Sequence, residues 1–121
     1  MSLGTVGWVD ITVPDAEKLR DFYCSVVGWT HQSVDMGGYS DFSMITPAGQ
    51  GAAGVCHARG QNANIPPVWP GHLMVADAAS AAAACTANGG EVLVGPKPVG
   101  GGQFAIIRDP AGAVCALFQA G

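Results

Sequence analysis

Residues 13–28 read VPDAEKLRDFYCSVVG, and residues 75–90 read VADAASAAAACTANGG. The two stretches share a Val, an Asp-Ala pair and a closing Gly, in the same order and at the same spacing. Two further pairs of matches follow at nearly the same separation: Gly-Gly at 37–38 and 100–101, and Pro-Ala-Gly at 47–49 and 110–112. Colinear matches in three blocks predict two copies of one module.

The first copy carries the signals of a strand followed by a helix. Apolar side chains alternate with others at Val9, Ile11 and Val13, which predicts a strand with two unlike faces. We expect these three residues to face the helix. Asp15 stands where a helix N-cap is expected, and Gly28 ends the helix. The helix repeats apolar residues every three or four positions, which predicts a single core-facing stripe. Its members are Leu19, Phe22, Tyr23, Val26 and Val27.

Short strand-like runs follow each helix, separated by glycine turns. In the first copy they lie near 29–35, 39–46 and 51–57. The second copy predicts a strand at 69–76, a helix at 78–88, and strands near 91–95, 103–108 and 113–118. The order βαβββ, taken twice, predicts an α+β fold with helices outside a curved eight-stranded mixed sheet or open barrel. We expect one domain over 1–121, built of modules at about 4–60 and 66–119.

Composition narrows the possible functions. The chain has 121 residues, of which 49% are hydrophobic and 12% charged, and its net charge is −4. The five Lys and Arg residues are too few and too scattered to form a basic patch for nucleic acid. The sequence also lacks a continuous apolar run long enough to predict a membrane span. The first residues lack the pattern of a secretory leader, and the four cysteines lack disulfide or metal spacing. These features predict a cytoplasmic protein.

The opening VPDAEKLRDFYCSVVGW and the closing FAIIRDPAGAVCALFQ resemble the vicinal oxygen chelate superfamily. That superfamily includes glyoxalase I, extradiol dioxygenases, fosfomycin resistance thiol transferases, methylmalonyl-CoA epimerase and bleomycin-binding proteins. The resemblance extends from about residue 6 to 118 and implies the tandem fold predicted from the repeat. It implies no single activity, because the superfamily supports many chemistries.

The resemblance also implies where metal ligands would lie. The family's ligand on the opening strand corresponds to Trp8 in the first copy and to Pro70 in the second, and its final carboxylate corresponds to Ala116. Trp, Pro and Ala offer no lone pair to a divalent ion. We therefore expect no metal or other cofactor. A divalent ion at a different site, for example one using Asp10, His57 and His72, is an alternative.

Two polar residues hold equivalent positions in the two copies. Asp10 precedes the capping Asp15 by the same distance as His72 precedes Asp77. Each lies two residues beyond a lost ligand position, and therefore on the strand face that forms the family's ligand cavity. An Asp and a His together could form an acid/base pair. Alternatively, both are structural residues that fix the register of the sheet.

Apolar and aromatic residues are predicted to line the same cavity. Large flat side chains there would suit an aromatic ligand. The candidates are Trp8, Trp69, Met74, Val114, Ala116 and Phe118. By strand periodicity, Trp69 would face the side opposite His72. Phe22 and Tyr23 are expected to lie on the core-facing side of the first helix.

Two functions from different classes remain open. The first is a metal-free binding protein for a small aromatic or hydrophobic molecule, held between the two modules and similar to the bleomycin-binding branch. The second is a lyase, isomerase or dioxygenase that uses Asp10 and His72, or an unrecognised metal site. A small molecule is the expected partner in both cases, and the resemblance implies that a homodimer is possible.

Overall fold

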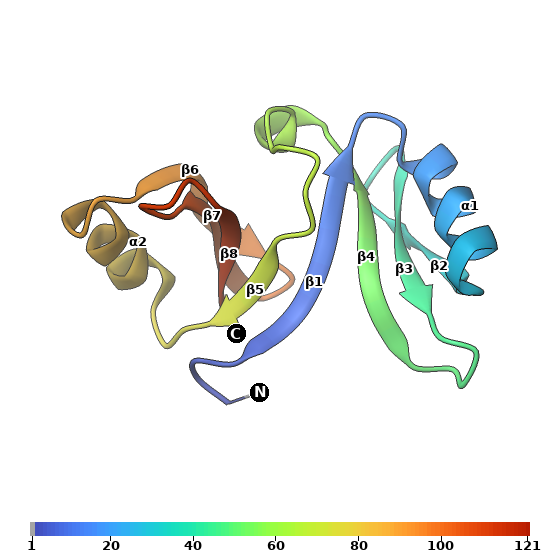
Figure 1. Ribbon diagram of the computed structural model, residues 1–121, viewed down its shortest axis with the longest axis horizontal. Helices are drawn as coiled ribbons and strands as arrows, with labels where there is room; N and C mark the ends of the chain where they lie inside the picture. The colour runs from blue at the N-terminus through green and yellow to red at the C-terminus, as the bar shows by residue number, and fades with distance from the viewer. Residues whose placement is uncertain (1) are drawn as a thin grey trace. The chain divides into compact units, whose positions relative to one another are not determined.

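A computed structural model describes residues 2–121, which form eight strands and two α-helices (Figure 1). The chain divides into two compact units, each described by itself below. The α1 unit is Val9–Val68, and the α2 unit comprises residues 2–8 together with Trp69–Gly121. The predicted α+β class is confirmed, with a helix and several strands in each unit.

The α1 unit holds most of the first copy of the repeat. Its elements are β1 (Val6–Val13, from Val9 onward), α1 (Ala16–Val27), β2 (Thr30–Asp35), β3 (Ser40–Ile45), β4 (Gly51–His57) and a short 3₁₀ turn, η1 (Gly60–Asn62). Asp15 caps α1 by accepting a hydrogen bond from the Lys18 N–H at 3.1 Å. Gly28 ends the helix with a left-handed φ of 77°, a conformation that favours glycine.

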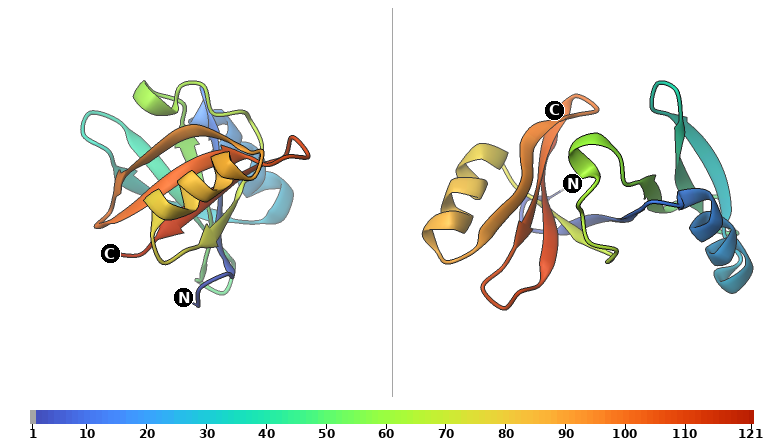
Figure 2. Two further views of the ribbon diagram at one scale, coloured as in Figure 1. Left: turned by 90° about the vertical axis from the view of Figure 1, so that its left-hand side faces the viewer. Right: turned by 90° about the horizontal axis from the view of Figure 1, so that it is seen from above.

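Helix α1 lies against the strands of its unit (Figure 2) and contacts β2, β3 and β4. Ile11 pairs with Val55, which pairs with Phe42, and these side chains are at most 6% exposed. The Arg20 guanidinium of α1 lies 4.5 Å from the centre of the Phe42 ring. Ile11 therefore faces the helix, as the alternation in β1 predicts.

The predicted core-facing stripe of α1 is wrong in part. Phe22, Val26 and Val27 are 54%, 60% and 46% exposed, whereas Ala16 is fully buried. The helix turns its Ala16 and Arg20 side toward the sheet, and the Arg20 guanidinium lies over the Phe42 ring. Leu19 and Tyr23 of the predicted stripe are half-buried, and its other three members lie at the surface.

The α2 unit repeats the arrangement with smaller helix residues. Its elements are β5 (Gly71–Met74), α2 (Ala78–Ala87), β6 (Glu91–Val99), β7 (Gly102–Arg108) and β8 (Val114–Gln119). Asp77 caps α2 through the Ser80 N–H at 3.1 Å. The core beneath α2 consists of Ala105, Ile107 and Leu117, with Ala81 and Cys85 from the helix packed against it.

The hydrogen-bonded strand order is β2-β3-β4-β1-β5-β8-β7-β6, in a sheet that does not close. The sheet is mixed: β1 pairs with β4 and β5 with β8 in parallel, while the outer strands pair antiparallel. Two strand lengths differ from prediction. β5 is shorter than 69–76, and β6 continues beyond 95 because its pairing with β7 shifts register and resumes at Lys97.

Within residues 2–121, neither helix has the length and apolar character needed to span a membrane.

Candidate functional site

The α1 unit presents a polar strand face opposite its helix. Asp10 pairs with Gly54 and Thr12 pairs with Cys56, so these residues face away from α1 while their neighbours Ile11 and Val55 face it. Asp10 therefore lies on the strand face opposite α1.

Cys56 on this face is held as a thiol. Burial raises its pKa, and the negative charges of Asp10 and Asp41 together with a hydrogen bond to Asp41 raise it further. A thiol becomes a nucleophile only when it ionises. Cys56 therefore contributes a polar thiol to this strand face and is not a reactive nucleophile.

Asp41, which the sequence reasoning did not single out, organises the end of β4. Its Oδ1 accepts a hydrogen bond from the His57 backbone N–H at 2.8 Å and lies 3.3 Å from His57 Nδ1. On the other side of the imidazole ring, His57 Nε2 lies 3.6 Å from Glu17 Oε1 of α1. The imidazole thus links β3, β4 and α1. The sequence feature that could have identified Asp41 as a candidate site residue is its carboxylate on a predicted strand with mostly apolar neighbours.

The histidines of the α1 unit do not gather with Asp10. His57 pairs with Val13 in the β1–β4 register, whereas Asp10 is three residues earlier and faces the opposite side. His31 is exposed on β2, and its ring packs edge-on against Phe42 at 5.7 Å. This arrangement disfavours a metal ion shared by Asp10 and His57.

The α2 unit presents an apolar strand face opposite its helix. Leu73, Leu117 and Ala105 pack toward α2, so the residues that alternate with them face the other way. Two cross-strand rows result: His72, Ala116, Ile106 and Val94 in one, and Met74, Phe118, Phe104 and Lys97 in the other. We call this surface the α2 open face.

His72 is the buried polar residue of the α2 open face. It is 7% exposed, and its Nδ1 lies 3.2 Å from the Pro70 carbonyl oxygen. A carbonyl oxygen can only accept, so Nδ1 is the donor in this contact. Asp10 and His72 lie in different units, and their pairing stays a prediction.

Four of the other predicted ligand-contacting residues, Met74, Val114, Ala116 and Phe118, lie on the α2 open face. Met74 and Ala116 are buried, while Phe118 and Val114 are half-buried and share the face by alternation along β8. Trp69 precedes β5, so the strand-periodicity argument that placed it opposite His72 does not apply. Trp8 is half-buried on β1, two residues before Asp10.

The residues at the family's metal positions do not fit a metal ion. Ala116 is fully buried on β8, and neither it nor Trp8 or Pro70 carries a donor that a divalent ion accepts. Among residues 2–121, no group of three or more His, Cys, Asp or Glu side chains is placed to hold one.

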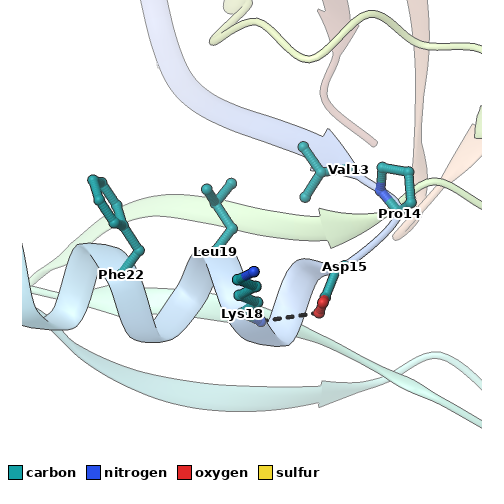
Figure 3. Close-up of a pocket in the computed structure, with 6 residues that line it drawn as sticks. All are labelled: Val13, Pro14, Asp15, Lys18, Leu19 and Phe22. Carbon is teal, nitrogen blue, oxygen red and sulfur yellow. Dashed lines mark hydrogen bonds between the residues drawn. The ribbon is translucent and has the colours of Figure 1, made fainter.

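A shallow apolar depression of about 430 Å³ lies where β1 meets α1 (Figure 3). Leu19 and Phe22 rise from the helix beside Val13, and Pro14 closes one end. Lys18 and Asp15 are the polar residues that complete the lining. The depression uses the helix stripe that the core leaves uncovered.

Comparison with known proteins is consistent with this fold. CFP32 of Mycobacterium tuberculosis, named provisionally as a glyoxylase, is 29% identical over 96% of this chain and 44% of its own length. The anthracycline biosynthesis protein DnrV of Streptomyces peucetius is 28% identical over 98% of this chain and 48% of its own. The chain thus spans about half the length of these relatives. Methylmalonyl-CoA epimerase of Streptomyces coelicolor, solved with 2-nitronate-propionyl-CoA, superimposes with a TM-score of 0.59 at 17% identity, covering 98% of this chain and 99% of the epimerase.

The model of one family matches residues 5–117, which is nearly the whole chain. The repeat, the strand order and the two capped helices fit that match. This chain is a member of the Glyoxalase/Bleomycin resistance protein/Dioxygenase superfamily.

Proposed function

We propose that this chain binds a small aromatic or hydrophobic molecule without the help of a metal ion. The observation that carries the proposal is the α2 open face. There Phe118 and Phe104 are half-buried cross-strand partners on the side of the sheet opposite α2. Aromatic side chains at such a position offer flat apolar area at little cost in conformational entropy.

The residues at the lost ligand positions support a metal-free mode of binding. At the positions where other superfamily members place metal donors, this chain has the half-buried Trp8 and the fully buried Ala116, and both side chains are apolar. The DnrV relative is named for anthracycline biosynthesis, and anthracyclines contain a flat fused-ring system. A planar polycyclic compound is therefore a suitable first probe.

The test uses a neutral planar probe, anthraquinone-2-carboxamide, titrated into protein dialysed against a chelator. Quenching of tryptophan fluorescence measures binding. We expect saturable binding that added divalent metal leaves unchanged, and Phe118→Ala should weaken it by roughly tenfold, as expected for one lost aromatic contact. Binding that requires added metal, or that Phe118→Ala leaves unchanged, would contradict the proposal.

A second candidate, proton transfer next to a carbonyl group, is favoured by one observation. The contact of His72 Nδ1 with the Pro70 carbonyl oxygen fixes the orientation of the imidazole, and an oriented imidazole is a common general base. The measurement is incorporation of solvent deuterium into the hemithioacetal of methylglyoxal and glutathione. Incorporation should be lost in His72→Gln, and equal incorporation in that variant would contradict this candidate.

A further inference from the structure

We propose that the ligand of the α2 open face is an aromatic acid, and that Lys97 binds its anionic group. This inference rests on the proposed function and goes further by specifying the ligand's charge. Lys97 pairs with Phe104 across β6 and β7, and Phe104 pairs with Phe118 across β7 and β8. A cation therefore ends a row of aromatic side chains that face the same way.

The ammonium group lies over the aromatic surface. Lys97 Nζ is 5.1 Å from the centre of the Phe104 ring, within the range of a cation–π contact, and the lysine is half-buried. Burial lowers the pKa of Lys97 from its ordinary value near 10.5. A partly desolvated cation attracts an anion more strongly than one in bulk water, because fewer water dipoles screen the pair. A planar acid stacked on the phenylalanines would bring its carboxylate to this ammonium.

A local irregularity of β6 places Lys97 on this face. Val94 pairs with Ile106, so in a regular strand residue 96 would share the open face and Lys97 would point toward α2. The register instead shifts by one between Val94 and Lys97, which returns Lys97 to the open face. The shift requires a glycine at position 95. Its φ is +76°, and a Cβ added there would collide with the backbone oxygen of Phe104.

The experiment compares two nearly isosteric probes, anthraquinone-2-carboxylate and anthraquinone-2-carboxamide, which differ in charge. We expect the wild-type protein to bind the carboxylate roughly tenfold more tightly, the difference that a single charge-assisted contact typically gives. Lys97→Met should abolish this preference while leaving carboxamide binding within about twofold. Lys97→Arg should keep it. Lys18→Met, at an exposed lysine of α1, is the matched control and should change neither affinity.

The outcomes separate the two proposals. If both probes bind and Lys97→Met leaves their affinity ratio unchanged, the acid preference is wrong and the binding function stands. If neither probe binds wild-type protein, both proposals fail. A pH series gives an independent readout: carboxylate affinity should fall as the pH rises through the lowered pKa of Lys97, while carboxamide affinity stays constant. Circular dichroism of each variant verifies its fold.

Discussion

Phe42→Ala should destabilise the α1 unit far more than Phe22→Ala, although both residues belong to apolar patterns in the sequence. Phe42 is 5% exposed, pairs with fully buried Val55 and lies beneath the Arg20 guanidinium, whereas Phe22 is 54% exposed. Removing a buried phenylalanine costs about 3–5 kcal/mol through lost burial and a residual cavity. The cation–π contact accounts for about 0.5–1 kcal/mol of that loss. Phe22→Ala should cost less than about 1 kcal/mol.

The assay is urea unfolding followed by both far-UV circular dichroism and tryptophan fluorescence, so that separate unfolding of the two units would be visible. At about 4 °C per kcal/mol, Phe42→Ala should also lower the melting temperature by roughly 12–20 °C. Equal losses for the two variants would refute the reasoning. They would mean that the Leu19, Phe22 and Val26 side of α1 is the buried one, as its spacing alone predicts.

Three further predictions concern the open faces and their supports. Asp41→Ala should cost about 1.5–3 kcal/mol in chemical denaturation, because the His57 backbone N–H loses a charged acceptor, and a loss below about 0.5 kcal/mol would contradict this role. The pKa of Cys56 is raised in the folded state, so the contribution of this thiol to stability is complete below about pH 9 and decreases at higher pH, where the unfolded thiol ionises. In a pH series of urea midpoints, Cys56→Ala should therefore show a smaller decrease at high pH than the wild type, and an unchanged pH dependence would contradict this assignment. Gly95→Ala should lower the melting temperature more than Gly100→Ala, since both have positive φ but a Cβ on Gly95 also meets backbone atoms, and similar shifts would exclude that collision.

The fold could be predicted from the sequence because its signals are local and repeated. Asp15 and Asp77 each begin a helix by accepting a backbone hydrogen bond, and both are recognisable from residue type and position. The alternation of Val9 and Ile11 predicted which side of β1 faces the helix, and the register confirms it for Ile11. Such features depend on the backbone and on nearest neighbours along the chain.

The missed features depend on contacts between distant segments. The core-facing side of α1 was assigned from apolar spacing, but an arginine can cover a buried ring and displace leucine or phenylalanine from that role. Lys97 was not recognised because strand alternation without a bulge would turn it toward α2. Trp69 was assigned to a strand that begins two residues later, at Gly71.

The two copies differ in side-chain chemistry on the strand faces opposite their helices. The β1–β4 and β5–β8 registers place Thr12 beside Cys56 in the α1 unit and Met74 beside Phe118 in the α2 unit. Continuing each register to the next strand brings Asp41 opposite Cys56 where the other unit has Phe104.

One backbone pattern therefore supports a polar row in the first copy and an apolar row in the second. A carboxylate beside a protonated thiol favours ligand groups that donate hydrogen bonds, and a pair of phenylalanines favours aromatic surface. Because side chains at equivalent positions changed while the strand pairing did not, the register required for folding leaves the chemistry of these faces free to vary. The apolar row that the proposed aromatic ligand would contact accordingly lies in the α2 unit, with Lys97 at its end.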